Sequence, residues 1–441
     1  MGHSRGGEGM RQALNIYGAG TASAKWKARI PGLKVRAIFE IGPVDLGTDA
    51  GTVKVDASEV AWNALIPGCD RDVSEFTGIN PFERVEVAKD DRFPKSIFTL
   101  WGANHNFFNA QWQVSDAPNG PHPCSGNQKA LWDAQAQAYL PAELEQFDFN
   151  ARAGLTGSEI QMKFEKALLL AFFHSHLGSG KELKWDRIFD PRYRLPRALS
   201  TLASSDREYL MRTGSKSVFD MSLANTLITP TDGLTLKTLK THIGDQLALM
   251  TKGLKNLGSQ LSFPAAPEGG FKATLAPGAF IRSAAVLEGR ARPGGYKIVL
   301  PFDQVESSEG YWTFDMALAM RKGCYNITSL YRVFQTRCED ATVDDNFEIA
   351  LVLADGSLSR PVKVKDYVMI GNGPGNYFQA QGLGDGGELL FKYTPLIYQT
   401  ARMDLTDFSV RGQSIKGVQF SFTSGDEVSL VIESMRLTRR L

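Results

Sequence analysis

The chain has 441 residues, of which 43% are hydrophobic and 22% are charged, a balance typical of soluble globular proteins. This length allows two or three domains with large cores. The chain has 49 basic and 48 acidic residues, so its composition lacks the excess of positive charge that is typical of proteins that bind nucleic acid or an anionic membrane. No apolar run approaches the roughly 20 residues that a membrane span requires.

The first hundred residues predict a parallel sheet. Apolar runs at 32–45, 60–70 and 95–106 are separated by segments long enough for crossover connections. Continuous apolar strands of this kind are typical of a parallel sheet that is buried on both faces. In such sheets, functional side chains gather in the loops that follow the C-terminal ends of the strands.

A helix is predicted at 156–178. Thr156 and Glu159 have the spacing of a capping box, and the helix carries an apolar stripe that includes Phe164, Leu168 and Phe172. We therefore expect a partial α/β domain at 1–180. A segment at 181–206, rich in Arg, Pro and Ser, is interpreted as a connection.

Residues 207–441 predict an antiparallel β-sandwich. Short strand-like runs recur between Gly, Pro, Asn and Asp turns, and Val418, Phe420 and Phe422 alternate with polar residues. The predicted fold class is thus α/β followed by all-β. Tyr311, Trp312 and Tyr377 are the aromatic candidates for a carbohydrate or surface contact through this sandwich.

Gly2-His3-Ser4-Arg5-Gly6 matches the G-x-S-x-G nucleophile elbow, in which a serine occupies a sharp strand-to-helix turn. Asp70 follows the second predicted strand and His105 follows the third. This gives the chain order Ser, Asp, His of α/β-hydrolases. A serine hydroxyl becomes a nucleophile when an imidazole takes its proton, and the imidazole needs a carboxylate to fix its tautomer.

The stretches GHSRGGEG (2–9), GCDRDVSEFTG (68–78) and LWGANHNFFNAQW (100–112) together resemble a group of large bacterial, usually exported α/β-hydrolases. Members of this group carry a C-terminal, jelly-roll-like β-sandwich. The resemblance implies that Ser4 is the nucleophile, Asp70 the acid and His105 the base, with no cofactor. The backbone N–H of Arg5 would contribute to the oxyanion hole.

The acid has an alternative in this sequence. Members of the group tend to read C-D-G-D-V, whereas this chain has Cys69-Asp70-Arg71-Asp72-Val73. Asp72 is therefore the alternative acid. The spacing to the valine favours Asp70.

The resemblance also predicts that the chain is N-terminally truncated at the elbow. A complete hydrolase sheet has several strands before the elbow strand, and the loop that supplies the second oxyanion donor would lie upstream of Met1. The full-length form is then expected to be secreted or periplasmic. Met1 is not followed by a signal peptide in this chain.

The four cysteines fall as one pair in each half of the chain. Cys69 with Cys124 and Cys324 with Cys338 would form two local disulfides in an oxidising compartment, while four reduced buried thiols fit the count equally well. No metal site is predicted. His174 and His176 lie two residues apart on a helix, so their side chains point about 200° away from each other.

These patterns predict a serine hydrolase that acts on small or polymeric carboxylic esters through an acyl-enzyme. We expect its activity to be impaired in the truncated chain. The alternative is a non-catalytic remnant whose sandwich binds a carbohydrate or a surface.

Overall fold

The computed structural model describes most of the two regions that the sequence predicts. The described residues are 1–18, 20–45, 55–68, 70, 72–73, 78–83, 85–86, 91–100, 103–109, 111, 132–133, 138–139, 159–177, 183–203, 205–210, 215–219, 234–239, 284–289, 296–320, 323–329, 332–339, 347–368, 370, 379–381, 391–393, 397–422 and 428–439.

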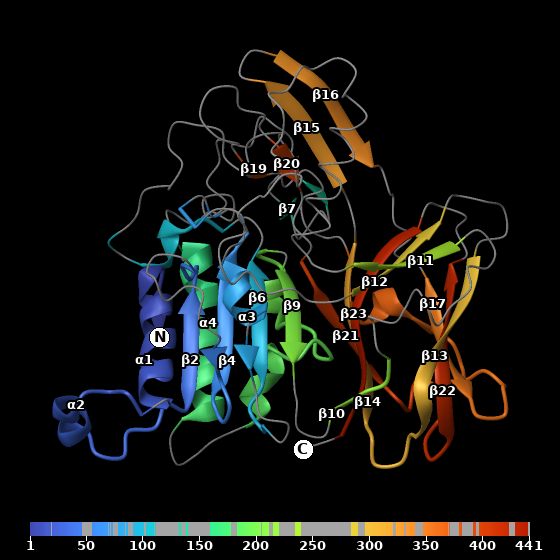
Figure 1. The fold of residues 1–441 in the computed structure, drawn as a ribbon, viewed down its shortest axis with the longest axis horizontal. Helices are drawn as coiled ribbons and strands as arrows, with labels where there is room; N and C mark the ends of the chain where they lie inside the picture. The colour runs from blue at the N-terminus through green and yellow to red at the C-terminus, as the bar shows by residue number, and fades with distance from the viewer. Residues whose placement is uncertain are drawn as a thin grey trace, which may run out of the picture.

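A five-stranded mixed sheet forms the N-terminal part of the molecule (Figure 1). Its order is β1-β2-β4-β6-β9, in which the first four strands pair in parallel and β9 runs antiparallel to β6. The strands are β1 (Gly2–His3), β2 (Ala37–Ile41), β4 (Ala61–Pro67), β6 (Lys95–Leu100) and β9 (Ser205–Leu210). The apolar runs predicted as the three parallel strands thus contain β2, β4 and β6.

Both faces of this sheet are buried, because apolar side chains leave each strand in both directions. Leu14 of α1 (Arg5–Gly18) packs with Ile38 and Trp62 on one face. On the other face, Phe164 and Phe172 of α4 (Glu159–His176) pack in one core with strand residues. The predicted helix at 156–178 therefore contains α4, while Thr156 lies outside the described residues.

The remaining elements around this sheet are short. The helices are α2 (Ala24–Arg29), α3 (Asn80–Glu83) and α5 (Arg197–Ser200), with the 3₁₀ helices η2 (Asn106–Phe108) and η5 (Leu183–Ile188). Two small sheets pair β3 (Val55–Asp56) with β5 (Val85–Glu86) and β7 (Trp132–Asp133) with β8 (Ala138–Tyr139). Among the described helices, none combines the length and the apolar character needed to cross a membrane.

Two antiparallel sheets form a β-sandwich in the C-terminal part. The first has the order β11-β12-β23-β14-β21, with β10 also paired to β23, and the second has the order β13-β22-β17-β18. Apolar side chains from both sheets share one core, as the predicted alternation at β22 requires. The strands are β10 (Ser215–Ser217), β11 (Leu234–Leu239), β12 (Ala284–Gly289), β13 (Tyr296–Ser307), β14 (Thr313–Met320), β17 (Glu348–Leu353), β18 (Val362–Lys363), β21 (Gln399–Asp404), β22 (Ser414–Phe422) and β23 (Val428–Thr438).

Two hairpins and one turn of helix accompany the sandwich. The hairpins are β15 (Gly323–Ser329) with β16 (Arg332–Glu339), and β19 (Gln379–Gln381) with β20 (Phe391–Tyr393). The 3₁₀ helix η7 spans Val364–Asp366. In the β15–β16 ladder, the backbones of Cys324 and Cys338 lie directly opposite each other.

The structure differs from the predicted connection and from its boundary at residue 207. The segment 181–206 contains η5, α5 and the first residues of β9, and Phe189 and Leu199 belong to the core beneath the sheet. Residue 207 lies inside β9, a strand of the N-terminal sheet. The polar sequence of β9 does not indicate that it belongs to this sheet, because its pairing depends on β6, which is distant in sequence.

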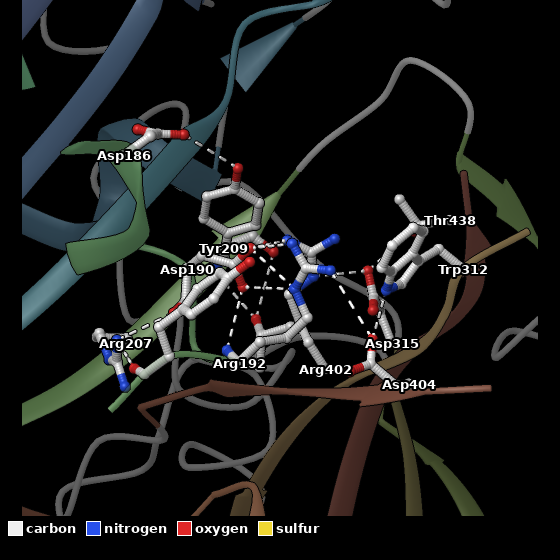
Figure 2. Close-up of polar contacts among 12 residues, drawn as sticks. Asp186, Asp190, Arg192, Arg207, Tyr209, Trp312, Asp315, Arg402, Asp404 and Thr438 are labelled. Atoms are coloured by element: carbon white, nitrogen blue, oxygen red, sulfur yellow. Dashed lines mark hydrogen bonds and ion pairs between the residues drawn. The ribbon is translucent and has the colours of Figure 1, made fainter. Parts of the chain in front are cut away.

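A buried polar cluster joins the sheet to the sandwich (Figure 2). Arg402 of β21 forms ion pairs with Asp190 at 2.9 Å and with Asp315 of β14 at 3.2 Å, and its guanidinium lies 4.7 Å from the ring centre of Tyr209 in β9. The Tyr209 backbone N–H also donates to the Thr400 hydroxyl at 2.9 Å. The two parts of the molecule therefore share specific contacts.

Candidate functional site

Four strand ends meet at one edge of the N-terminal sheet. Ser4 follows β1, Gly42 follows β2, Asp70 lies in the loop after β4, and His105 lies in the loop after β6. The C-terminal ends of parallel strands share an edge, which explains how residues about 100 positions apart in sequence come together. The Ser4 N–H donates to the Ile41 carbonyl at 2.9 Å, which fixes Ser4 beside the end of β2.

Ser4 occupies a strained turn between β1 and α1. Its φ is +57°, a left-handed conformation that a non-glycine residue adopts at an energetic cost of order 1–3 kcal/mol. The following residue, Arg5, begins α1, so its N–H belongs to the first turn of a helix, where amides have no partner within the helix. This is the strand–turn–helix context that the G-x-S-x-G motif predicts.

The glycines around Ser4 serve different purposes. A Cβ on Gly2 would lie 2.2 Å from the Gly6 carbonyl oxygen, so the close approach of β1 to α1 requires glycine there. A Cβ on Gly6 would meet nothing within 4 Å, whereas one on Gly7 would lie 2.8 Å from the Cβ of Pro43. Of the two glycines in the G-x-S-x-G motif, Gly2 is therefore required by the close packing, whereas the space beside Gly6 would accommodate a Cβ.

Asp70 and His105 form a buried pair. The Nδ1 of His105 lies 2.7 Å from Oδ2 of Asp70, and both side chains are almost completely shielded from solvent. The other Asp70 oxygen accepts the Val73 N–H at 2.7 Å, which fixes the carboxylate plane. This arrangement holds the imidazole in one orientation, with Nε2 directed away from Asp70.

Asp72 lies on the opposite side of the same ring. Its Oδ2 is 3.4 Å from Nε2 of His105, and its side chain is 65% exposed. The two candidate acids therefore contact different ring nitrogens, and only Asp70 contacts Nδ1. A carboxylate that orients a catalytic histidine binds the nitrogen that does not face the nucleophile.

The backbone of Gly42 lies directly beside the Asp70–His105 pair. Its φ is +46°, and a Cβ at this position would lie 3.1 Å from both Oδ2 of Asp70 and Nδ1 of His105. Gly42 lies near the end of the apolar run 32–45, a position that indicates only the end of a strand. The turn signal Gly42-Pro43 marks the strand end but carries no information about the side chains that reach it from β4 and β6.

The loop that carries His105 is anchored by α4. The Asn104 backbone N–H donates to Gln161 at 2.9 Å, and the Gln161 amide donates back to the Asn104 carbonyl at 3.0 Å. The Asn104 side chain also accepts the N–H groups of Asn106 and Phe107, each at 3.0 Å. Gln161 is completely buried within the helix that covers this face, and the sequence pattern did not single it out.

The other sequence-predicted positions lie away from this edge or outside the described residues. His176 faces Asp186 at 3.3 Å, and His174 stacks on Trp185. Within the described ranges, no group of three His, Cys, Asp or Glu side chains is arranged to hold a metal ion. Cys69, Cys124 and Tyr377 lie outside the described residues.

The two described aromatic candidates of the sandwich have local partners. The Trp312 indole donates to Asp404 at 2.6 Å, beside the Arg402 cluster. The Arg439 guanidinium lies 5.0 Å from the ring centre of Tyr311. Both side chains are partly buried, so packing within the protein covers part of each aromatic ring.

A scan against protein-family models and a search of curated proteins both find no match for this chain. A search of solved structures finds carbohydrate-binding modules. A family 11 module from Clostridium thermocellum in complex with a β-1,3-1,4-mixed-linked tetrasaccharide is 10% identical, covering 52% of this chain and 97% of its own, with a TM-score of 0.22. A family 27 module from Caldicellulosiruptor saccharolyticus in complex with mannohexaose is 13% identical, covering 37% and 76%, with a TM-score of 0.19.

Proposed function

We propose that this chain carries the catalytic residues of a serine hydrolase that acts on carboxylic esters, with Ser4 as nucleophile, His105 as general base and acid, and Asp70 as the orienting acid. The observation that supports it best is the buried 2.7 Å contact between Asp70 and Nδ1 of His105, at the same sheet edge as the strained turn of Ser4.

The reaction proceeds in two steps, acylation of Ser4 and hydrolysis of the acyl-enzyme. Ser4 Oγ bonds to the ester carbonyl carbon as its proton moves to Nε2 of His105, and the resulting imidazolium is stabilised by Asp70. His105 then gives this proton to the leaving alkoxide, which leaves as the alcohol. Water, deprotonated by His105, attacks the acyl-Ser4 carbonyl, and the carboxylic acid is released as Ser4 takes its proton back.

The turn that strains Ser4 also supplies an anion-stabilising group. The Arg5 N–H lies in the first turn of α1, where the helix dipole and unpaired amides favour negative charge. We assign this N–H to the carbonyl oxygen that becomes negative in the tetrahedral intermediate. Donors preorganised in this way are usually the largest electrostatic contribution to acyl transfer.

The test compares the full chain with Ser4→Ala. We expect the full chain to hydrolyse p-nitrophenyl acetate and to be labelled at Ser4 by a fluorophosphonate, and Ser4→Ala to lose labelling and more than about 10³-fold in kcat. The matched control is Ser409→Ala, because Ser409 also has a positive φ of 60° but lies in the sandwich. Turnover retained by Ser4→Ala contradicts the proposal.

The alternative is that the sandwich binds a carbohydrate or a surface and that the chain has no hydrolytic role. It rests on the two-sheet fold and on the partly exposed side chains of Tyr311 and Trp312. Retardation of the full chain in gels containing a soluble β-glucan, abolished by Tyr311→Ala, would support it. Failure of Ser4 labelling together with such retardation would favour this alternative over the hydrolase.

A further inference from the structure

We propose that His3, the residue before the nucleophile, is a positioning residue that holds the His105 loop against the end of β1. This inference rests on the proposed function. It assigns a role to the first variable position of the G-x-S-x-G motif, where the sequence pattern itself requires no particular side chain.

The contact that carries the inference is a hydrogen bond between the two segments. Nε2 of His3 lies 2.9 Å from the backbone carbonyl oxygen of His105. Because a carbonyl oxygen can only accept, Nε2 of His3 must carry the hydrogen. The strand that presents Ser4 is thereby tied directly to the loop that presents its base, 102 residues further along the chain.

The two imidazole rings also pack against each other. Their centres lie 4.7 Å apart with an interplanar angle of 32°, and Phe108 contacts the His3 ring edge-on at 6.1 Å. The His105 loop is thus held from two sides, by the Asn104–Gln161 hydrogen bonds on α4 and by His3 on β1. Together with the Asp70 contact, these restraints limit the displacement of the His105 ring, and a displacement of about 1 Å can cost 10²-fold in rate.

The charge of His3 suits this role. Burial lowers the pKa of His3 to about 4, with the neighbouring His105 ring acting in the same direction, while the bond to the His105 carbonyl and the charge of Asp72 oppose these effects. His3 is therefore neutral near pH 7. When His105 becomes an imidazolium during the reaction, a neutral ring beside it donates a hydrogen bond without adding repulsion.

The first test uses the unmodified full chain. NMR of the histidine rings should show His3 at pH 7 as the neutral tautomer with hydrogen on Nε2, titrating near pH 4. A His3 ring that carries its hydrogen on Nδ1 at pH 7 would overturn the inference, because such a ring has no donor for the His105 carbonyl. This measurement needs neither substrate nor turnover.

The second test compares variants in the rate of fluorophosphonate labelling and in kcat and KM for p-nitrophenyl acetate. His3→Leu removes the donor, and we expect kcat to fall about 10-fold or more with KM within about twofold. His3→Gln restores an uncharged N–H donor and should recover most of the labelling rate. His174→Gln is the matched control, since His174 stacks on Trp185 away from the sheet edge.

The outcomes separate the two proposals. If the unmodified chain is not labelled at Ser4, the proposed function fails, while the NMR measurement still decides the position of the His3 hydrogen. If the unmodified chain is labelled at Ser4, and the His3→Leu variant folds and is labelled at the same rate, the positioning role fails while the proposed hydrolase function is retained. If His3→Leu does not fold, two measurements remain decisive. One is the kcat of His3→Gln relative to that of the unmodified chain, and the other is the tautomer of His3.

Discussion

At the scale of single residues, the site is organised around one imidazole with a carboxylate on each side. Asp70 is buried and contacts Nδ1 of His105, whereas Asp72 is mostly exposed and contacts Nε2. An exposed carboxylate is screened by water and gains little from its partner, while a buried one loses its solvation and depends on its contacts. Asp70 and Asp72 are thus two aspartates, two positions apart, that lie in different environments and contact different atoms of His105.

We predict that Asp70→Asn is far more damaging than Asp72→Asn. An asparagine at position 70 no longer fixes the tautomer of His105 or stabilises its imidazolium, and we expect kcat to fall by roughly 10⁴-fold. Asp72→Asn should change kcat by less than about 10-fold, since Asp72 is screened by solvent. Steady-state hydrolysis of a nitrophenyl ester measures both, and the reverse ranking would assign the acid to Asp72.

The sequence identified Ser4, Asp70, Asp72 and His105 as candidates because each follows a strand or fits a motif. It could not rank the two acids from contacts, since the ranking depends on which ring nitrogen each carboxylate reaches. The sequence also did not single out His3. Its contact with His105 exists only because β1 and β6 end at the same sheet edge.

At the scale of elements, the end of β2 controls the space beside the site. Gly42 turns the chain with a positive φ at the point where Asp70 and His105 meet, so the absence of a Cβ there is part of the site geometry. Glycine is thus favoured at position 42 for two reasons: the positive φ of the backbone and the lack of space for a Cβ. The two can be separated experimentally, because Gly20 has a positive φ in open space.

We predict that Gly42→Ala removes fluorophosphonate labelling of Ser4. The added Cβ would lie 3.1 Å from both Oδ2 of Asp70 and Nδ1 of His105, so one of these groups must move. Gly20→Ala carries a similar backbone cost, about 1–2 kcal/mol, without a neighbour within 4 Å. Denaturant unfolding should show comparable losses of stability in both variants, but only Gly20→Ala should be labelled normally. Normal labelling of Gly42→Ala would contradict this view of the strand end.

The elements themselves were predictable to different degrees. β2, β4, β6 and α4 lie within the predicted segments because each carries a continuous or periodic apolar pattern. β9 was interpreted as part of a connection and of the sandwich, because its sequence SDREYL lacks a strong apolar pattern. Its pairing with β6 supplies the hydrogen bonds that the pattern could not reveal.

At the scale of the whole molecule, the sequence predicted a sheet region and a sandwich but not how they join. The joining residues are charged and far apart: Arg402 and Asp190 are separated by 212 positions and Arg402 and Asp315 by 87. Isolated charged residues in a sequence are usually solvated surface groups. Here Arg402 is 5% exposed, and the pKa of Arg402 is raised because Asp315 and Asp190 outweigh the effect of burial.

We predict that Arg402→Met destabilises the molecule by about 3–5 kcal/mol, because Asp190 and Asp315 lose the cation they share. Asp190 retains the Arg192 guanidinium at 2.7 Å, so the loss falls mainly on the buried charge of Asp315. Arg360→Met, which removes an exposed guanidinium from the same sandwich, should cost less than about 1 kcal/mol. Urea unfolding followed by circular dichroism measures both. Adding Asp315→Asn to Arg402→Met should restore part of the loss, since position 315 then no longer buries an uncompensated charge, while Asp190 keeps its ion pair with Arg192 at 2.7 Å. If this double variant is no more stable than Arg402→Met alone, the loss comes from packing, and charge pairing is not what joins the sheet to the sandwich.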